Sequence, residues 1–248
     1  MFHPSLVHHQ SCRGTDCRLH LPDTFGLLCW NIHKNNRLPD FSRYLASLHT
    51  EHTISLMLFQ EAEFRDESAY GLGDFAFDAA ANLELAGTFY GVLTASPIES
   101  KEAKAYLSEA KESLIGTHKS LLFSRYQFIA GTPLLILNLH AINFREAGSY
   151  ERELRTFIER TEAYEGAMIV AGDFNRWSRG RARRLHAFRE RLGLDTVLFE
   201  EKRKIKAFMG KHLDFIFYRG VELIDSAVFD DHELSDHNPL YAKFRIIS

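Results

Sequence analysis

The sequence predicts an α/β fold in which two β-sheets pack face to face and helices cover their outer sides. Short apolar runs typical of strands alternate with amphipathic helical stretches along the whole chain. Apolar residues make up 45% of the 248 residues, which is enough for a large core. No linker rich in Pro, Gly and Ser divides the chain, so we expect one domain over residues 25–248, after an N-terminal arm over residues 1–24.

Strands are expected where apolar runs end in polar residues. Residues 134–140 (LLILNLH) are almost wholly apolar, which indicates a strand buried on both faces. Residues 212–218 (HLDFIFY) alternate between apolar and polar positions, as a strand with one buried face does. Further strands are expected over residues 27–32, 54–61, 90–95, 120–125, 167–173 and 240–247.

Helices are expected where apolar residues recur at spacings of three and four. Residues 41–49 form one such stretch, and residues 181–194 form another that ends at a glycine. A helix is also expected to start at Gly148–Ser149, with the serine as its N-cap. Residues 79–85 and 103–114 are less regular, and we expect them to be helical as well.

The first 24 residues are rich in potential metal ligands, but their spacing matches no structural zinc pattern. We expect a loosely ordered arm there. The three cysteines are an odd number near the N-terminus, which is a poor disulfide framework and typical of a reducing compartment. With no secretory signal and no apolar run of about 20 residues, a cytoplasmic location is expected. The potential ligands in the first 24 residues are His3, His8, His9, His20, Cys12 and Cys17, and the third cysteine is Cys29.

The stretch VAGDFNRWS, residues 170–178, places Asp173 and Asn175 directly after an apolar run. Taken alone, this pattern is explained by a strand followed by a turn, since Gly, Asp and Asn favour turns. The same arrangement recurs at other apolar runs and just before the last expected strand. One shared cleft explains all of these positions, whereas turn chemistry has to be invoked separately for each. The recurring positions are Asn31, Glu61, His140, Asp236 and His237.

These residue types suit the hydrolysis of phosphate esters. Carboxylates and amide oxygens form the hard-cation site that Mg²⁺ accepts, with Mn²⁺ as the alternative. Such an ion neutralises a phosphate oxygen and stabilises the charge that develops during hydrolysis. Asp173 can position and deprotonate a water for in-line attack, while Asn175 orients that water or the phosphate. Histidines beside carboxylates are held charged and can donate to phosphoryl or leaving oxygens.

Six motifs in order give a specific resemblance. The stretches WNIHK, FQE, LNLHAINF, GDFN, LDFIF and SDHNP resemble the endonuclease/exonuclease/phosphatase superfamily, which includes deoxyribonuclease I and the exonuclease III-type abasic-site endonucleases. Each motif alone is weak, but the ordered set runs from about Leu27 to Phe244. The resemblance implies a four-layered α/β/β/α sandwich of two mixed sheets with helices outside, and divalent-metal-dependent hydrolysis of phosphate esters.

The resemblance also implies roles for the residues that match its motifs. Glu61 matches the metal-binding glutamate and Asn31 the asparagine that supports the metal site. Asp236 matches the terminal acid, and its carboxylate chemistry makes it the further expected metal ligand. Asp173 and Asn175 match the pair that activates the water and orients the phosphate.

Two histidines and a further carboxylate complete the matching set. His140 corresponds to a histidine that contacts phosphate, and His237 to the histidine of the terminal acid–histidine pair. Asp214 corresponds to the carboxylate that orients a catalytic histidine, which is either His140 or His237. Without the resemblance, Asp214 is equally well explained as a polar residue on the outer face of an alternating strand.

The finer match is to a little-characterised bacterial branch. The stretches GVLTAS, HKSLLF and NLHAINF, together with Trp177 after GDFN, resemble that branch more than the repair enzymes. Lys119 either contacts phosphate or is a solvated lysine at a strand edge. The catalytic tyrosine of the repair enzymes has no clear counterpart, since Tyr90 and Tyr106 match by rough position only. The expected substrate contacts are Lys119, Asn143, Arg176 and Trp177.

The choice of substrate rests on charge. The net charge is −3, so a protein of this composition needs a local positive patch to bind nucleic acid. A cluster of arginines after Asn175 predicts that patch, and nucleic acid is the expected substrate of a monomeric enzyme. A lipid head group or another small phosphate ester is the alternative, and a noncatalytic binding module is the third possibility. The cluster consists of Arg176, Arg179, Arg181, Arg183, Arg184, Arg189 and Arg191.

Overall fold

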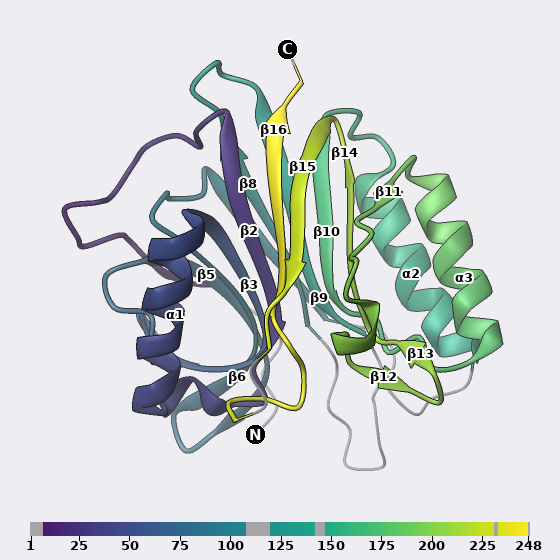
Figure 1. Ribbon diagram of the computed structural model, residues 1–248, viewed down its shortest axis with the longest axis horizontal. Helices are drawn as coiled ribbons and strands as arrows, with labels where there is room; N and C mark the ends of the chain where they lie inside the picture. Colours follow the sequence, from purple (N-terminus) through teal and green to yellow (C-terminus); the bar gives the residue numbers. More distant parts are fainter. Residues whose placement is uncertain (1–6, 108–119, 142–146, 231–232, 248) are drawn as a thin grey trace.

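The computed structural model describes residues 7–107, 120–141, 147–230 and 233–247. Two β-sheets stack face to face between helical layers (Figure 1). Helix α1 (Pro39–His52) covers one outer face, and α2 (Ala147–Thr161) with α3 (Arg179–Arg191) covers the other. This is the four-layered α/β/β/α sandwich that the resemblance implies. None of the described helices is long and apolar enough to cross a membrane.

The first sheet has the strand order β1-β5-β6-β3-β2-β16-β15, with β4 added beside β3. The strands β2 and β3 run parallel, and the other pairs in this sheet are antiparallel. Their bounds are β1 Val7–Gln10, β2 Thr24–Asn31, β3 Ile54–Arg65, β4 Ser68–Ala69, β5 Ala76–Leu85, β6 Thr88–Ser96, β15 Val221–Val228 and β16 Leu240–Ile246.

The second sheet has the strand order β11-β14-β10-β9-β8-β7. Here β9 and β10 are parallel, whereas β14 runs antiparallel to β10. A small separate hairpin, β12–β13, and two short 3₁₀ helices, η1 and η2, complete the described elements. The bounds are β7 Glu102–Leu107, β8 Ser120–Gln127, β9 Pro133–His140, β10 Ala167–Asp173, β11 Asp195–Thr196, β14 Asp214–Arg219, β12 Ala207–Phe208, β13 Lys211–His212, η1 Asn35–Arg37 and η2 Lys202–Lys204.

The apolar residues form one layer between the sheets and one under each helical layer. Leu58 and Ile136 belong to the layer between the sheets, while Leu45 of α1 packs on the first sheet and Phe157 of α2 on the second. Burial of these side chains supplies most of the driving force for the fold. The sandwich is therefore held by three stacked apolar layers, as its strand and helix patterns predict.

A buried amide pair joins the two sheets. Gln60 of β3 donates from Nε2 to Oδ1 of Asn138 on β9 at 2.8 Å, and both side chains are fully buried. The Asn138 amide donates in turn to the main-chain carbonyls of Phe59 and Leu93. A satisfied buried network of this kind favours one register of sheet on sheet. It fixes the distance between β3 and β9 next to the residues that end these strands.

Two segments that we expected to be helical are strands. Residues 79–85 belong to β5, and residues 103–107 belong to β7, while residues 108–114 lie outside the described part of the chain. The alanines of β5 carry a helix preference, but tertiary pairing overrides it. A Cβ at Gly91 on β6 would lie 2.0 Å from the carbonyl oxygen of Ala80, so the two backbones approach closely there. Small residues make that close pairing possible.

The N-terminal arm also differs from its expected loose state. Residues 7–10 form β1, which pairs with β5, and Leu21 is fully buried. The expectation that the cysteines form no disulfide is wrong, because Cys12 and Cys17 are bonded. Their Cα atoms lie 5.8 Å apart, within the range that a disulfide spans. Sequence spacing alone does not reveal that the loop between them turns back on itself.

Candidate active site

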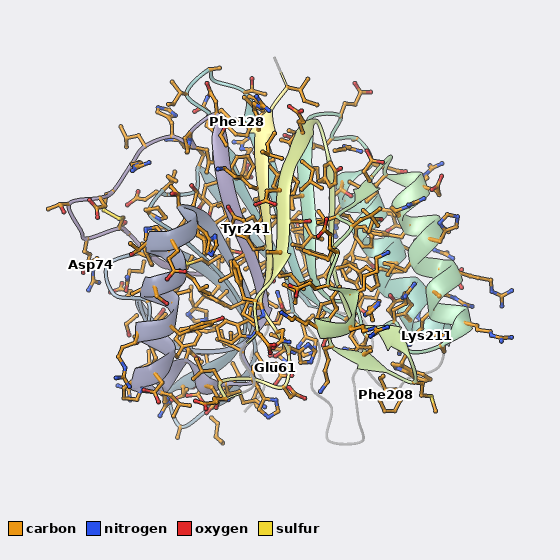
Figure 2. The ribbon with its side chains drawn as sticks, viewed as in Figure 1. Glu61, Asp74, Phe128, Phe208, Lys211 and Tyr241 are labelled. Atoms are coloured by element: carbon orange, nitrogen blue, oxygen red, sulfur yellow. A yellow bond between two sulfur atoms is a disulfide. The ribbon has the colours of Figure 1, made fainter. Side chains whose placement is uncertain are left out.

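One cleft of about 500 Å³ gathers the polar residues that end the strands. It lies at the end of the sandwich where Glu61 is labelled (Figure 2). The expectation that these residues converge is confirmed, although their individual chemical roles stay predictions. The predicted residues that line the cleft are Asn31, Glu61, His140, Asp173, Asn175, Trp177, Asp236 and His237.

The strand pairings explain this convergence. Strands β2 and β3 are parallel with Asn31 beside Gln60, so Asn31 and Glu61 reach the same edge. Strands β9 and β10 are parallel with His140 in register with Asp173. Asp173 is also in register with Asp214, the first residue of the antiparallel β14. Three of the predicted residues thus lie side by side across one sheet.

A β-bulge directs Glu61 into the cleft. The register between β3 and β6 shifts between Phe59 and Ala62, and Glu61 has a φ of 55°. Bulges often redirect a side chain beside an active site, and a non-glycine residue with positive φ is uncommon. Nδ2 of Asn31 lies 3.4 Å from Oε1 of Glu61, and Nζ of Lys34 lies 3.2 Å from Oε2. The carboxylate is therefore held between an amide and a cation.

The turn after β10 is held by its own side chains. The Asn175 main-chain N–H donates to Oδ1 of Asp173 at 2.9 Å, and Nδ2 of Asn175 donates to the carbonyl of Ala141 at 3.0 Å. Asn175 has a φ of 48°, a conformation that Asn adopts more readily than most residues. The sequence Asp-x-Asn therefore builds a rigid loop, and both side chains are almost fully buried.

Arg181 was expected to be part of the positive patch for nucleic acid, but it is only 1% exposed. Its Nη1 donates to the main-chain oxygen of Asn175 at 3.0 Å. The guanidinium lies 4.6 Å from the ring centre of Tyr150 and 5.0 Å from that of Trp177. Such cation–π contacts and the hydrogen bond compensate for burial of the charge. Arg181 thus supports the loop that carries Asn175 and Trp177.

The other predicted arginines also lie away from the cleft. Arg176 packs over the ring of Phe215, and Arg183, Arg184 and Arg191 line a separate groove between α2 and α3. Within the described residues, the cleft contains no arginine, and its basic residues are Lys34, Lys206 and histidines. The cluster that suggested nucleic-acid binding therefore does not form a groove past the site. Lys119 and Asn143 lie outside the described residues.

Asp214 pairs with His237 rather than His140, which settles the alternative that the sequence left open. Oδ2 of Asp214 lies 2.8 Å from Nδ1 of His237. Burial opposes a charge on His237, but the carboxylates of Asp214, Asp173 and Asp236, helped by the Asp214 hydrogen bond, outweigh it and raise its pKa to about 9. The main-chain oxygen of His237 also accepts a bond from Nε1 of Trp30 at 2.7 Å. The imidazolium is thereby oriented and kept charged at neutral pH.

His140 lies between two carboxylates on the other side of Asp173. Its Nε2 is 3.5 Å from Oδ2 of Asp173 and 3.9 Å from Oε1 of Glu61. Nδ2 of Asn31 is likewise 3.4 Å from Oδ2 of Asp173. Asp173 therefore lies at the centre of the polar network, with contacts to both a histidine and an amide.

The donor set fits a hard divalent cation. Oxygen atoms of Asp173 and Asp214 lie within 4.8 Å of each other, and Oδ1 of Asp214 is buried without a hydrogen-bond partner in the described structure. His237 lies in the same group, but as an imidazolium it donates hydrogen bonds and does not bind a metal ion. A buried, unpaired carboxylate oxygen is costly unless a cation or a proton meets it. Glu61 and Asp236 line the same cleft, and carboxylate oxygens are the ligands that Mg²⁺ and Mn²⁺ prefer.

Asp236 and Lys206 form a pair that the sequence did not reveal. Nζ of Lys206 lies 2.6 Å from Oδ2 of Asp236, and Nδ1 of His33 lies 3.6 Å from Oδ1. Burial raises the pKa of Asp236, but Lys206, His237 and His33 outweigh it and lower the pKa overall. Sequence reasoning missed Lys206 because its contribution depends on a hairpin that returns to the cleft.

The chain is similar in sequence to bacterial UPF0294 proteins. A UPF0294 protein of Vibrio cholerae serotype O1 is 32% identical over 233 residues, which are 93% of this chain and 81% of that protein. A UPF0294 protein of Yersinia enterocolitica serotype O:8 is 34% identical over 228 residues, which are 88% of this chain and 83% of that protein.

Solved structures share the fold. An endonuclease/exonuclease/phosphatase family protein from Leptotrichia buccalis has a TM-score of 0.68 and 15% identity, and the match covers 90% of this chain and 100% of that one. D. rerio TDP2 complexed with single strand DNA product has a TM-score of 0.63 and 15% identity, covering 90% and 99%. A model of the endonuclease/exonuclease/phosphatase family matches residues 28–237. The chain therefore belongs to the endonuclease/exonuclease/phosphatase family.

Proposed function

We propose that this protein is a divalent-metal-dependent phosphodiesterase that hydrolyses nucleic-acid phosphodiester bonds by in-line attack of an activated water. The observation that carries this proposal is the position of Asp173, which is in register with both His140 and Asp214 in a cleft that Glu61 also lines. A base, a charged donor and metal-binding carboxylates thus meet at one place. These are the groups that phosphoryl transfer to water requires.

Each side chain has a role in the proposed reaction. Asp173 positions the attacking water and accepts its proton. Asn175, fixed by its bonds to Asp173 and Ala141, orients the water or the phosphate. His237, held as an imidazolium by Asp214, donates to a phosphoryl or leaving oxygen as negative charge develops there. His140 contacts a phosphate oxygen from the other side.

Glu61 and Asp236, supported by Asn31, are proposed to hold Mg²⁺ or Mn²⁺. Such an ion would neutralise a phosphate oxygen and stabilise the negative charge that develops during hydrolysis. Lys34 and Lys206, which now neutralise these two carboxylates, are flexible side chains that can be displaced.

Nucleic acid as the substrate is supported by the aromatic rings in the cleft. Tyr90, Trp177 and Phe208 line it together with the catalytic residues, and bases stack on such rings. One structural neighbour, TDP2, is complexed with single strand DNA product. A lipid head group or other small phosphate ester is the second candidate, favoured by the exposed side chain of Leu85 at the turn between β5 and β6. The complete catalytic set argues against a noncatalytic binding module.

An activity panel tests this proposal. It comprises plasmid DNA, single-stranded DNA, abasic duplex, RNA, inositol phosphates and sphingomyelin, each with Mg²⁺, with Mn²⁺ and with EDTA. We expect metal-dependent cleavage of a nucleic acid and no cleavage in EDTA. Cleavage of sphingomyelin or inositol phosphates alone would replace the substrate assignment. The absence of metal-dependent cleavage of every member would contradict the proposed function.

A further inference from the structure

We propose that residues Lys202–His212, termed here the basic hairpin, are the element that binds single-stranded nucleic acid beside the catalytic cleft. The inference rests on the proposed function and names the surface that receives the polymer. The contact with nucleic acid was expected from the arginines that follow Asn175, whereas the basic hairpin carries mostly lysines.

The basic hairpin is strongly cationic in a chain whose net charge is −3. It contains four lysines, one arginine and no acidic residue. Lys204 and Lys206 pair with Glu201 and Asp236. Lys202, Arg203 and Lys211 form no ion pair with the described residues. Unpaired cations on one short segment attract phosphates and release counterions when they bind them.

The hairpin is anchored to the catalytic residues through the main chain. The N–H of Leu213 donates to the carbonyl of Lys206 at 2.9 Å, and the N–H of Phe174 donates to the carbonyl of Leu213 at 2.8 Å. Phe174 lies between the catalytic Asp173 and Asn175. Figure 2 shows Phe208 and Lys211 at the same end of the molecule as Glu61. A polymer held by the hairpin is therefore held next to the proposed scissile phosphate.

The tip of the hairpin has a residue that its backbone does not favour. Met209 and Gly210 connect β12 to β13 with φ values of 50° and 72°. Two-residue turns with positive φ at both positions favour Asn-Gly, and methionine is strained there. The Met209 side chain is 77% exposed, so packing within the protein does not offset this strain. A contact with a ligand gives a reason for an apolar side chain at this position.

The aromatic lining favours a nucleic acid over a membrane as the occupant. Phe208, next to Met209, faces the cleft that Tyr90 and Trp177 also line. Unpaired bases stack on such rings, and cations beside them hold the backbone. A membrane contact would instead use apolar side chains directed away from the catalytic residues. Stacking requires exposed base faces, so we infer that single strands bind more tightly than duplexes.

The salt dependence of oligonucleotide binding tests whether the basic hairpin contacts phosphates. Fluorescence anisotropy of a labelled 20-nucleotide oligothymidylate is followed in EDTA, with a labelled duplex as the comparison. Lys211→Gln and Arg203→Gln are each expected to reduce the slope of log K against log salt by about 0.7, the value for one phosphate contact on a single strand. Arg183→Gln on α3 removes one charge elsewhere and is expected to leave the slope unchanged.

Met209→Asn separates ligand binding from folding. Asn suits the turn, so the melting temperature should be equal or higher. Loss of the apolar side chain should weaken single-strand binding about three- to tenfold. Equal binding by Met209→Asn and the wild type, or a slope changed by Arg183→Gln and not by Lys211→Gln, would overturn the inference.

Vesicle flotation tests whether the basic hairpin binds a membrane instead. Flotation with phosphatidylglycerol vesicles is measured for the wild type and Met209→Asn. Vesicle binding that depends on Met209, with oligothymidylate binding unaffected, would overturn the inference in favour of a lipid surface. Hydrolysis of bis(p-nitrophenyl) phosphate by the wild type is measured separately. If hydrolysis fails while binding behaves as expected, the proposed function fails and the binding surface stands.

Discussion

At the scale of single residues, the polar side chains that end the strands and line the cleft could be predicted from the sequence. Asp173, Asn175 and His140 each follow an apolar run, and the structure brings them into one cleft. Arg181 and Lys206 could not be predicted in this way. Arg181 bonds to the carbonyl of Asn175 and Lys206 to the carboxylate of Asp236, and these contacts form only when the chain folds in three dimensions. A buried arginine and a surface arginine have the same sequence signal.

Arg181→Met tests the buried cation. The variant keeps most of the side-chain volume but removes the donor to the Asn175 carbonyl. We expect the free energy of unfolding to fall by about 2–4 kcal/mol, because a buried acceptor loses its partner. The exposed Arg183→Met is the matched control and should change it by less than about 0.5 kcal/mol. Urea denaturation measures both, and equal stabilities would show that Arg181 is not needed to hold the loop.

The Asp214–His237 pair predicts a pH dependence of stability in the metal-free protein. Because the folded-state pKa of His237 is about 9, the pair's contribution is complete below pH 6.5 and is lost as the pH rises to 9. Asp214→Asn removes the largest of the carboxylate charges that raise this pKa. Over that interval the wild type should lose up to about 3 kcal/mol more than the variant. Urea denaturation in EDTA at several pH values measures this, and parallel profiles would contradict the assignment.

At the scale of elements, strands with a clear apolar period could be predicted, and alanine-rich ones could not. Residues 134–140 are buried as expected, whereas residues 79–85 form a strand despite their helical preference. The deciding factor is the close backbone approach of Ala80 to Gly91, which no local pattern encodes. The bulge at Glu61 was likewise not predictable, although it directs the side chain.

Gly172 shows how closely the catalytic strand is packed. A Cβ there would lie 1.9 Å from the carbonyl oxygen of Leu139, and the φ is 149°. Gly172→Ala should therefore destabilise the fold by more than about 3 kcal/mol, since backbone must shift. Gly73→Ala is the matched control, because Gly73 also has positive φ but nothing within 4 Å. Its cost should be about 1 kcal/mol. Thermal denaturation distinguishes the two, and similar losses would refute the close approach.

At the scale of the whole molecule, the layer order and the shared cleft were predictable because six short motifs fall at the ends of strands. What the sequence left open was which charges reach that cleft. Arg183, Arg184 and Arg191 of α3 line a separate groove, and the described lysines that line the cleft are Lys34 and Lys206. Charge composition along a chain does not say which face of the folded molecule carries it, since that depends on how the layers stack.

The most direct test measures hydrolysis of bis(p-nitrophenyl) phosphate by the wild type and Asp173→Asn, with Mg²⁺ or Mn²⁺ and with EDTA. The wild type should release p-nitrophenolate only with metal. The variant, with unchanged circular dichroism, should be slower by a factor of about 10² or more, as expected when a general base is lost. Hydrolysis that persists in EDTA, or an Asp173→Asn variant as active as the wild type, would contradict the account.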